Sequence, residues 1–218
     1  MVFIESMKHL ILALLFICAA SFVSADVFDH PLNTDTLSSF VAVRTAIAAH
    51  AFQKGSFLQT KHIAKLNRNL VSSGEYLISK ADGIVWQTKK PFPSTMIVST
   101  HTVVQIAASG KKTVLQAGNN ATFESFAKVI SSVFQGGSAL SETNFALYFE
   151  GDEKNWKVGL VPKESAIRAV AEKFVLQGSS AMDSVTMHEK NGDFVRYEFA
   201  NVVFPDTLTD DEKTFFAE

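Results

Sequence analysis

The stretch LVSSGEYLISKADGIVWQT, residues 70–88, decides the fold. Two runs rich in β-branched and aromatic residues flank the dipeptide Asp82-Gly83, which readily takes the positive φ values of a tight hairpin turn. The sequence therefore predicts antiparallel strands over residues 70–80 and 84–88. Because side chains alternate along a strand, Ile84 and Trp86 are expected on one face of the second strand.

Similar runs on both sides extend this hairpin into a larger sheet. Upstream, alternation predicts a strand over residues 56–63 that places Phe57 and Ile63 on one face. Downstream, strands are predicted over residues 95–99, 102–108, 113–116, 145–150, 156–161, 174–176, 185–189 and 194–200. The last two flank Asn191-Gly192, another hairpin dipeptide. Short turns between consecutive strands indicate a single antiparallel sheet.

Two longer helices accompany the predicted strands. Thr34 or Asp35 can cap the first, which Gly55 is expected to end. The second, over residues 122–134, carries an apolar stripe and interrupts the series of strands, so we expect it to cover the concave side of the sheet. Short helical turns are also expected over residues 165–171 and 208–215.

The first 25 residues have the layout of a secretory signal peptide, with a basic start, an apolar stretch and small residues before Ala25. The uninterrupted apolar run, residues 10–20, is shorter than the about 20 residues that a membrane-spanning helix needs. We expect cleavage after Ala25 and one domain over residues 26–218. Cys18 is the only cysteine, so its removal leaves no thiol for a disulfide or a metal.

Composition narrows the classes of partner. The net charge is −2 and the basic residues are scattered, which argues against nucleic-acid binding. The chain has nineteen Phe but only three Tyr and two Trp, so it requires apolar volume without polar handles. A large core and a ligand cavity both explain this.

Catalytic motifs are missing from the sequence. It contains no G-x-S-x-G element, no phosphate-binding glycine loop and no pair of histidines at zinc-site spacing. We therefore expect a protein that is not an enzyme and needs no cofactor or metal. An enzyme of envelope lipid metabolism stays open as an alternative, since groups such as His62 or His101 could converge in space.

Several segments, taken in order, resemble one known family. They are GSFLQTK at residues 55–61, SGEY at 73–76, GIVWQTKKP at 83–91, WKVGLVPK at 156–163 and the hairpin at 191–201. This series is similar to the LolA-like lipoprotein carriers. The resemblance implies an α+β fold, a single-domain incomplete antiparallel β-barrel with a helical lid, located in the periplasm.

The resemblance also implies a function. Such a protein binds the acyl chains of lipoproteins or another lipid in an apolar cavity, receives them from an inner-membrane exporter and passes them to an outer-membrane acceptor. We expect a monomer. An envelope module that senses lipids or lipoproteins through a stable partner protein is the alternative.

The candidate site residues are apolar side chains of the predicted strands and of the lid helix. They are Phe57, Ile84, Trp86, Ile97, Phe123, Phe126, Ile130, Leu147 and Phe149. Which face of each strand looks inward stays open. Lys80 falls where family members have an arginine that latches the lid; because lysine lacks the guanidinium fork, we expect a weaker latch.

Overall fold

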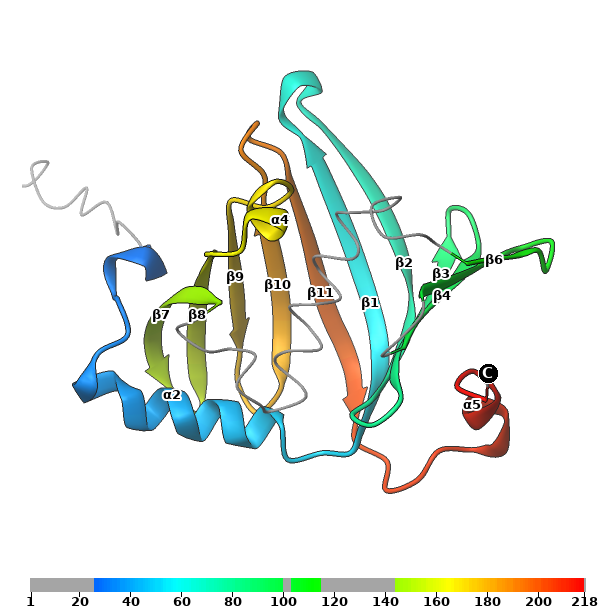
Figure 1. Cartoon of the computed structure of the whole chain (residues 1–218), viewed down its shortest axis with the longest axis horizontal. Helices are drawn as coiled ribbons and strands as arrows, with labels where there is room; N and C mark the ends of the chain where they lie inside the picture. Colours follow the sequence, from blue (N-terminus) through cyan, green and yellow to red (C-terminus); the bar gives the residue numbers. More distant parts are fainter. Residues whose placement is uncertain (1–25, 100–102, 115–143, 218) are drawn as a thin grey trace, which may run out of the picture.

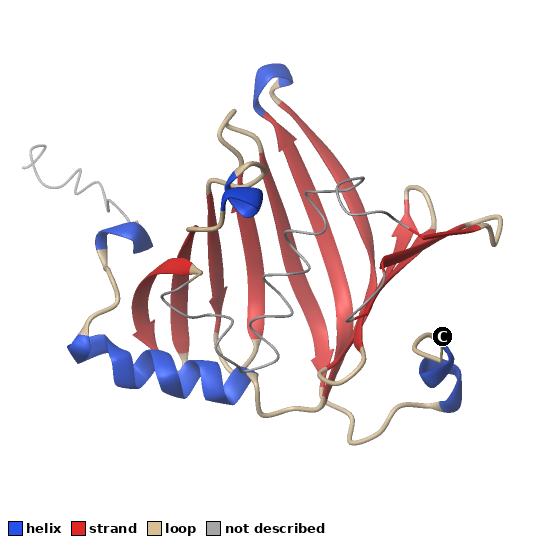
Figure 2. Ribbon diagram, viewed as in Figure 1, coloured by secondary structure: helices blue, strands red, loops and turns tan. Residues whose placement is uncertain are grey.

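The computed structural model describes residues 26–99, 103–114 and 144–217. Within these ranges, eleven strands form one sheet in the order β6-β5-β4-β3-β2-β1-β11-β10-β9-β8-β7, and all neighbours are antiparallel (Figure 1). Because β6 and β7 stand at opposite ends of this order, the sheet is not closed. Few helices accompany it (Figure 2). The predicted α+β class with an incomplete antiparallel barrel is confirmed.

The elements follow the chain in this order: η1 (Val27–Asp29), α2 (Thr34–Ile47), β1 (Phe52–Ile63), η2 (Ala64–Leu66), β2 (Arg68–Ser79), β3 (Gly83–Lys90), β4 (Ser94–Ser99), β5 (Val103–Ala107), β6 (Lys112–Val114), β7 (Phe145–Asp152), β8 (Asn155–Pro162), α4 (Ser165–Arg168), β9 (Lys173–Gly178), β10 (Met182–His188), β11 (Phe194–Val203) and α5 (Asp210–Thr214). The helix predicted over residues 122–134 lies outside the described residues.

The predicted hairpins form at the expected dipeptides. Gly83 has a φ of 129° and Gly192 a φ of 88°, values that only glycine adopts readily. The first turn sets the register of β2 against β3, so that Tyr76 lies opposite Trp86. Ile84 and Trp86 share a face, as predicted.

Both boundaries of the first helix were predicted wrongly: Thr34 and Asp35 lie inside the helix and do not cap it. The side chain of Asn33 caps α2 by accepting hydrogen bonds from the backbone N–H groups of Asp35 and Thr36 at 2.9 and 3.1 Å, and the helix ends at Ile47. Gly55 does not end this helix but lies inside β1. A Cβ there would come within 2.8 Å of the carbonyl oxygen of Ala200, so close packing, not helix termination, requires the glycine.

The sheet has two distinct faces. One face carries Phe57, Ile84 and Trp86, and we call it the inner face. Helix α2 packs against this face through Phe40 and Val43. The outer face carries the alternate residues of the same strands. On β3, for example, Val85 lies between two inner-face residues and belongs to a separate apolar cluster.

The N-terminal segment passes around the edge strand β7. The ring of Phe28 packs on the outer-face residue Tyr148 at 5.2 Å between centroids. The backbone N–H of Leu32 then donates to the carbonyl of Leu147, and the N–H of Phe149 donates to the carbonyl of His30. The chain therefore crosses from the outer to the inner face along β7 and occupies part of that strand's free hydrogen-bonding edge.

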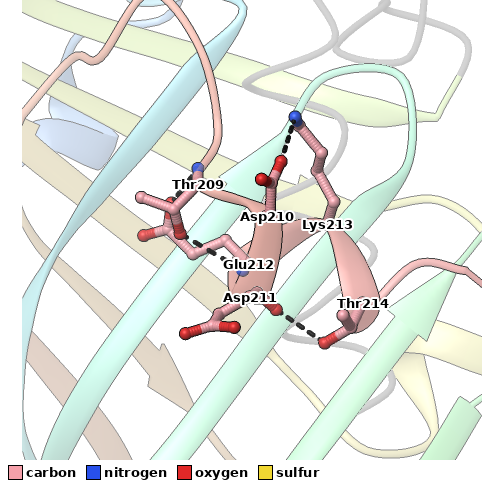
Figure 3. Close-up of polar contacts among 6 residues, drawn as sticks. All are labelled: Thr209, Asp210, Asp211, Glu212, Lys213 and Thr214. Atoms are coloured by element: carbon pink, nitrogen blue, oxygen red, sulfur yellow. Dashed lines mark hydrogen bonds and ion pairs between the residues drawn. The ribbon is translucent and has the colours of Figure 1, made fainter.

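The C-terminal segment covers part of the outer face. Thr209 and Glu212 form a capping box at the start of α5 (Figure 3). The backbone N–H of Glu212 donates to the Thr209 hydroxyl at 3.3 Å, and the backbone N–H of Thr209 donates to the Glu212 carboxylate at 2.9 Å. Lys54 Nζ donates to Glu212 Oε1 at 2.8 Å and joins this helix to β1. Phe215 and Phe216 pack against the outer cluster around Val85.

Candidate functional site

The predicted site residues separate into three sets. Phe57, Ile84, Trp86, Leu147 and Phe149 are all buried in one apolar cluster on the inner face. Phe123, Phe126 and Ile130 lie outside the described residues. Ile97 lies opposite Val85 and packs in the outer cluster. Its inclusion among the inner-face candidates was therefore wrong, because the neighbouring residues Met96 and Val98 are the ones that face inward.

Five aromatic side chains, which we call the aromatic group, gather on the inner face where β1, β2, β3 and β11 run side by side. They are Phe57, Tyr76, Trp86, Tyr197 and Phe199. Trp86 is the centre: its ring stacks on Phe57 at 4.2 Å and meets Tyr197 edge-on at 5.1 Å. Offset and edge-to-face contacts of this kind stabilise aromatic pairs beyond the burial of their area.

Two glycines make room for this arrangement. A Cβ on Gly74 would lie 3.0 Å from the Phe57 ring, and one on Gly55 would lie 3.1 Å from the Tyr76 ring. Each ring can therefore lie close over the backbone of the adjacent strand, because that strand presents no side chain there. The close packing of the rings at the middle of the inner face depends on both glycines.

A buried hydrogen bond adds a polar contact to the aromatic group. Gln53 Nε2 donates to the Tyr76 hydroxyl at 2.8 Å, and both side chains are buried. Burial raises the pKa of Tyr76 from 10.0 to about 12, against a smaller lowering by Gln53. Burial also raises the pKa of Tyr197. Both tyrosines are therefore neutral at physiological pH.

The other half of the inner face is mostly aliphatic on β8 to β10, where Trp156 and Phe174 are its aromatic residues. On β8 to β10 the inward side chains include Leu160, Phe174 and Val185, which are fully buried. The Phe40 ring of α2 meets the Phe149 ring edge-on at 5.8 Å and covers the end of β7. Ile167 of α4 joins the same cluster. The apolar inner face thus runs continuously from β7 to β4.

Lys80 lies where the chain leaves β2, next to the end of α2. Its Nζ donates to the carbonyl oxygen of Ala48, the C-cap residue, at 3.0 Å. Its backbone N–H donates to the carbonyl of Ala51 at 2.9 Å. A cation at a helix C-terminus is stabilised by the helix dipole and by the free carbonyls there. Lys80 therefore holds the end of α2 against β2 through one side-chain hydrogen bond.

Two grooves open on the outer face. One, of about 570 Å³, crosses β11, β1, β2 and β3 and is lined by residues such as Leu58, Glu75 and Glu198. The other, of about 380 Å³, lies between the sheet and the C-terminal segment, between Leu77 and Phe215. Three residues of the aromatic group also take part in lining these grooves, Phe57 and Phe199 in the first and Tyr76 in the second.

Residues 50–215 match the protein family described as outer membrane lipoprotein carrier protein LolA. The chain belongs to the LolA family.

Solved structures similar to this LolA-family chain have low sequence identity to it. A LolA superfamily protein from Nitrosomonas europaea is 8% identical, with a TM-score of 0.48, over 81% of this chain and 96% of its own. A DUF1329 family protein from Desulfovibrio piger is 9% identical, with a TM-score of 0.46, over 82% and 96%. LprF from Mycobacterium bovis is 10% identical, with a TM-score of 0.42, over 83% and 98%. No curated protein matches the sequence. The family assignment of the chain therefore depends on the sequence match.

Sequence reasoning missed the polar and aromatic partners of Trp86 in this LolA-family chain. Tyr76 could have been found, because the Asp82-Gly83 turn fixes the residue opposite Trp86. Gln53 meets Tyr76 through the pairing of β1 with β2. Tyr197 and Phe199 could not have been found, since their positions depend on β1 pairing with β11, a contact between strands more than a hundred residues apart.

His62, one histidine that the enzyme alternative invoked, does not face the aromatic group. It lies opposite Phe194, stacks on that ring at 5.0 Å, and is five positions from the inward-facing Phe57. Alternation therefore places it on the outer face. His101 lies outside the described residues.

The described residues contain neither a cluster of metal-binding side chains nor a helix that could span a membrane. No group of three or more His, Cys, Asp or Glu side chains is placed to hold a metal ion. None of the helices there has the length and apolar composition to span a bilayer.

Proposed function

We propose that this protein binds the acyl chains of lipoproteins, or of another lipid, against its inner face and carries them through the periplasm from the inner to the outer membrane. The observation that carries the proposal is the continuous apolar inner face, running from β7 to β4. Membership of a family described as lipoprotein carriers supports it.

The chemistry of the inner face suits hydrocarbon. Each buried methylene contributes about 0.8 kcal/mol, so a few acyl chains can be held without any specific polar contact. The stacked rings of Phe57 and Trp86 are apolar and lie in the middle of this face, where we propose that the ligand is held. In this proposal the polar edge of the group, Gln53 and Tyr76, satisfies its own hydrogen bond and does not compete for the ligand.

The proposed lining comprises Phe57, Ile84, Trp86, Leu147 and Phe149, with Phe123, Phe126 and Ile130 contributed by a lid helix over residues 122–134. Residues 1–25 direct export and are removed after Ala25. An inner-membrane exporter supplies the cargo and an outer-membrane acceptor takes it. No catalytic step is part of this proposal.

Native mass spectrometry of the exported protein tests the proposal directly. We expect lipid mass to remain bound after gentle purification and to leave with the unfolding of the protein. Recovery of a stable protein partner without any lipid would favour the sensing module instead. Turnover of an added phospholipid would favour the enzyme alternative.

A matched pair of substitutions separates ligand binding from stability. Ile84 and Val85 are neighbours and equally buried, but they face opposite sides of β3. Both Ile84→Thr and Val85→Thr should destabilise the protein, because each buries a hydroxyl, and Ile84→Thr should cost about 1 kcal/mol more because it also deletes a methylene. Only Ile84→Thr should weaken the binding of a fluorescent fatty acid, by about five-fold. Equal affinities of the two variants would refute the inner face as the binding surface.

We also propose that Lys80 acts as a weak latch through the end of α2. The contact with the Ala48 carbonyl supports a role in holding this helix. Lys80→Met keeps the aliphatic stem and removes the donor, so it should speed the release of bound lipid. Unchanged loading and release in this variant would show that the contact is only structural.

A further inference from the structure

The hairpin of β1 and β2 ends in a projecting tip, which we define as residues 64–71. The two strands pair up to Ile63 opposite Arg68, and η2 closes the turn. On the side of β2 that faces away from β1, pairing with β3 begins only at Ser73. Residues 68–72 therefore have no strand partner on that side within the described residues. Figure 1 shows the tip extending past the neighbouring strands, at the end of the sheet away from α2.

Exposed apolar side chains are concentrated at this tip. Leu66, Leu70 and Val71 are 59%, 53% and 54% exposed. Leu70 and Val71 are successive residues of a strand and so point to opposite faces. A rigid protein partner that covers one of these faces leaves the other in water. A fluid lipid interface surrounds the tip and can bury both.

The same tip carries unpaired positive charge. Lys65 and Arg68 are exposed, and so is Lys190 in the adjacent β10–β11 turn. Within the part of the chain that the structure describes, none of these three forms an ion pair.

The nearby acidic residues are already engaged. Glu189 lies 3.9 Å from Lys61 Nζ, and Asp193 accepts a hydrogen bond from the backbone N–H of Ala64 at 2.9 Å. The second contact also ties the tip to the turn that carries Lys190. These two carboxylates keep their charge, but four cations, Lys61, Lys65, Arg68 and Lys190, lie beside them, so the net charge of the tip and the adjacent turn is positive.

We propose that the tip is a membrane-docking element that binds a bilayer surface carrying anionic headgroups. Lys65, Arg68 and Lys190 contact the headgroups, and Leu66, Leu70 and Val71 enter the interfacial region. Apolar burial and attraction to anionic lipid together determine the strength of interfacial binding. The element is separate from the inner face, so docking does not depend on the proposed cargo.

Flotation of the exported protein with vesicles tests this inference. We expect binding to vesicles containing phosphatidylglycerol and little binding to pure phosphatidylcholine. Each basic residue near an anionic surface raises the affinity for the membrane roughly five-fold. The double variant Lys65→Glu with Arg68→Glu should therefore lower the affinity for these vesicles at least about 25-fold. Leu66→Ser with Leu70→Ser should lower the binding that persists at high salt, where charge attraction is screened.

Matched controls keep the test specific. Lys111→Glu with Lys154→Glu makes the same change in net charge at two distant turns, and Phe92→Ser removes an apolar residue that is 82% exposed. Both should bind vesicles as the unchanged protein does. No binding of the unchanged protein, or an equal loss in the controls, would overturn the inference. Fatty-acid affinity should be the same in all tip variants, so failure here is distinguishable from failure of the inner-face proposal.

Discussion

The two halves of the sheet use different kinds of apolar packing. On β8 to β10, inward side chains such as Leu160, Phe174 and Val185 are fully buried and mostly aliphatic. On β1 to β3, the inner face is aromatic, depends on glycines that leave room for the rings, and includes a hydrogen-bonded Gln53–Tyr76 pair. The first half is built as a folding core. The second packs aromatic rings beside a buried hydrogen bond, and it is the half that we propose contacts the ligand.

The largest effect is expected in the aliphatic half. Leu160→Ala should lower the free energy of unfolding by about 4 kcal/mol, because it leaves a cavity in a site with little freedom to collapse. Ile106→Ala, on the half-buried strand β5, should cost about 1 kcal/mol. Urea denaturation of both variants measures the difference. Similar costs would mean that Leu160 packs no more tightly than a half-buried residue near the rim of the sheet.

A slightly smaller effect is expected at a glycine of the aromatic half. In Gly74→Ala the new methyl group would overlap the carbonyl oxygen of Gln87 and crowd the Phe57 ring. We expect a loss of about 3 kcal/mol together with a change in tryptophan fluorescence, since Phe57 stacks on Trp86. Gly110→Ala is the control, because a methyl group there meets nothing within 4 Å. Its only cost is the positive φ, about 1 kcal/mol.

The buried tyrosines predict instability at alkaline pH. The pKa of Tyr76 is about 12 in the folded protein and 10.0 in its ordinary environment, so its contribution is complete below pH 10 and is lost as the pH rises toward 12. We expect this residue to lower the free energy of unfolding by about 1 kcal/mol at pH 11 and by about twice that once the pH exceeds 12. Denaturation at pH 8 and pH 11 should show a smaller pH dependence in Tyr76→Phe. An unchanged dependence would assign the effect to other groups.

The smallest effect is expected at the C-terminal ion pair. The hydrogen bond from Lys54, supported by the backbone of Thr209, lowers the pKa of Glu212 below its ordinary value of 4.5. The pair therefore stabilises the protein above that value and stops doing so as the pH falls through the lowered pKa. Because both side chains are partly exposed, Glu212→Gln should cost only about 0.5 kcal/mol at pH 7. The variant and the unchanged protein should be equally stable at pH 3.

Local patterns in the sequence predicted most of the strands. Asp82-Gly83 and Asn191-Gly192 identified their hairpins, and alternation placed Ile84 with Trp86 on one face. Alternation cannot say which face another segment will cover, and this is why Ile97 was misplaced. Its neighbours Phe215 and Phe216 come from the far end of the chain. Gly55 was misread for a similar reason: the carbonyl that requires it belongs to Ala200.

Residues 30–32 cover part of the edge of β7, which affects whether a second copy of the protein can pair with this strand. A free strand edge invites pairing with a second chain, and edges are commonly blunted by covering them or by placing lysines there. Here Pro31 bridges to Tyr148, and residues 30–32 take backbone hydrogen bonds of β7 that another strand could otherwise form. This part of the edge is therefore closed to pairing with a second chain.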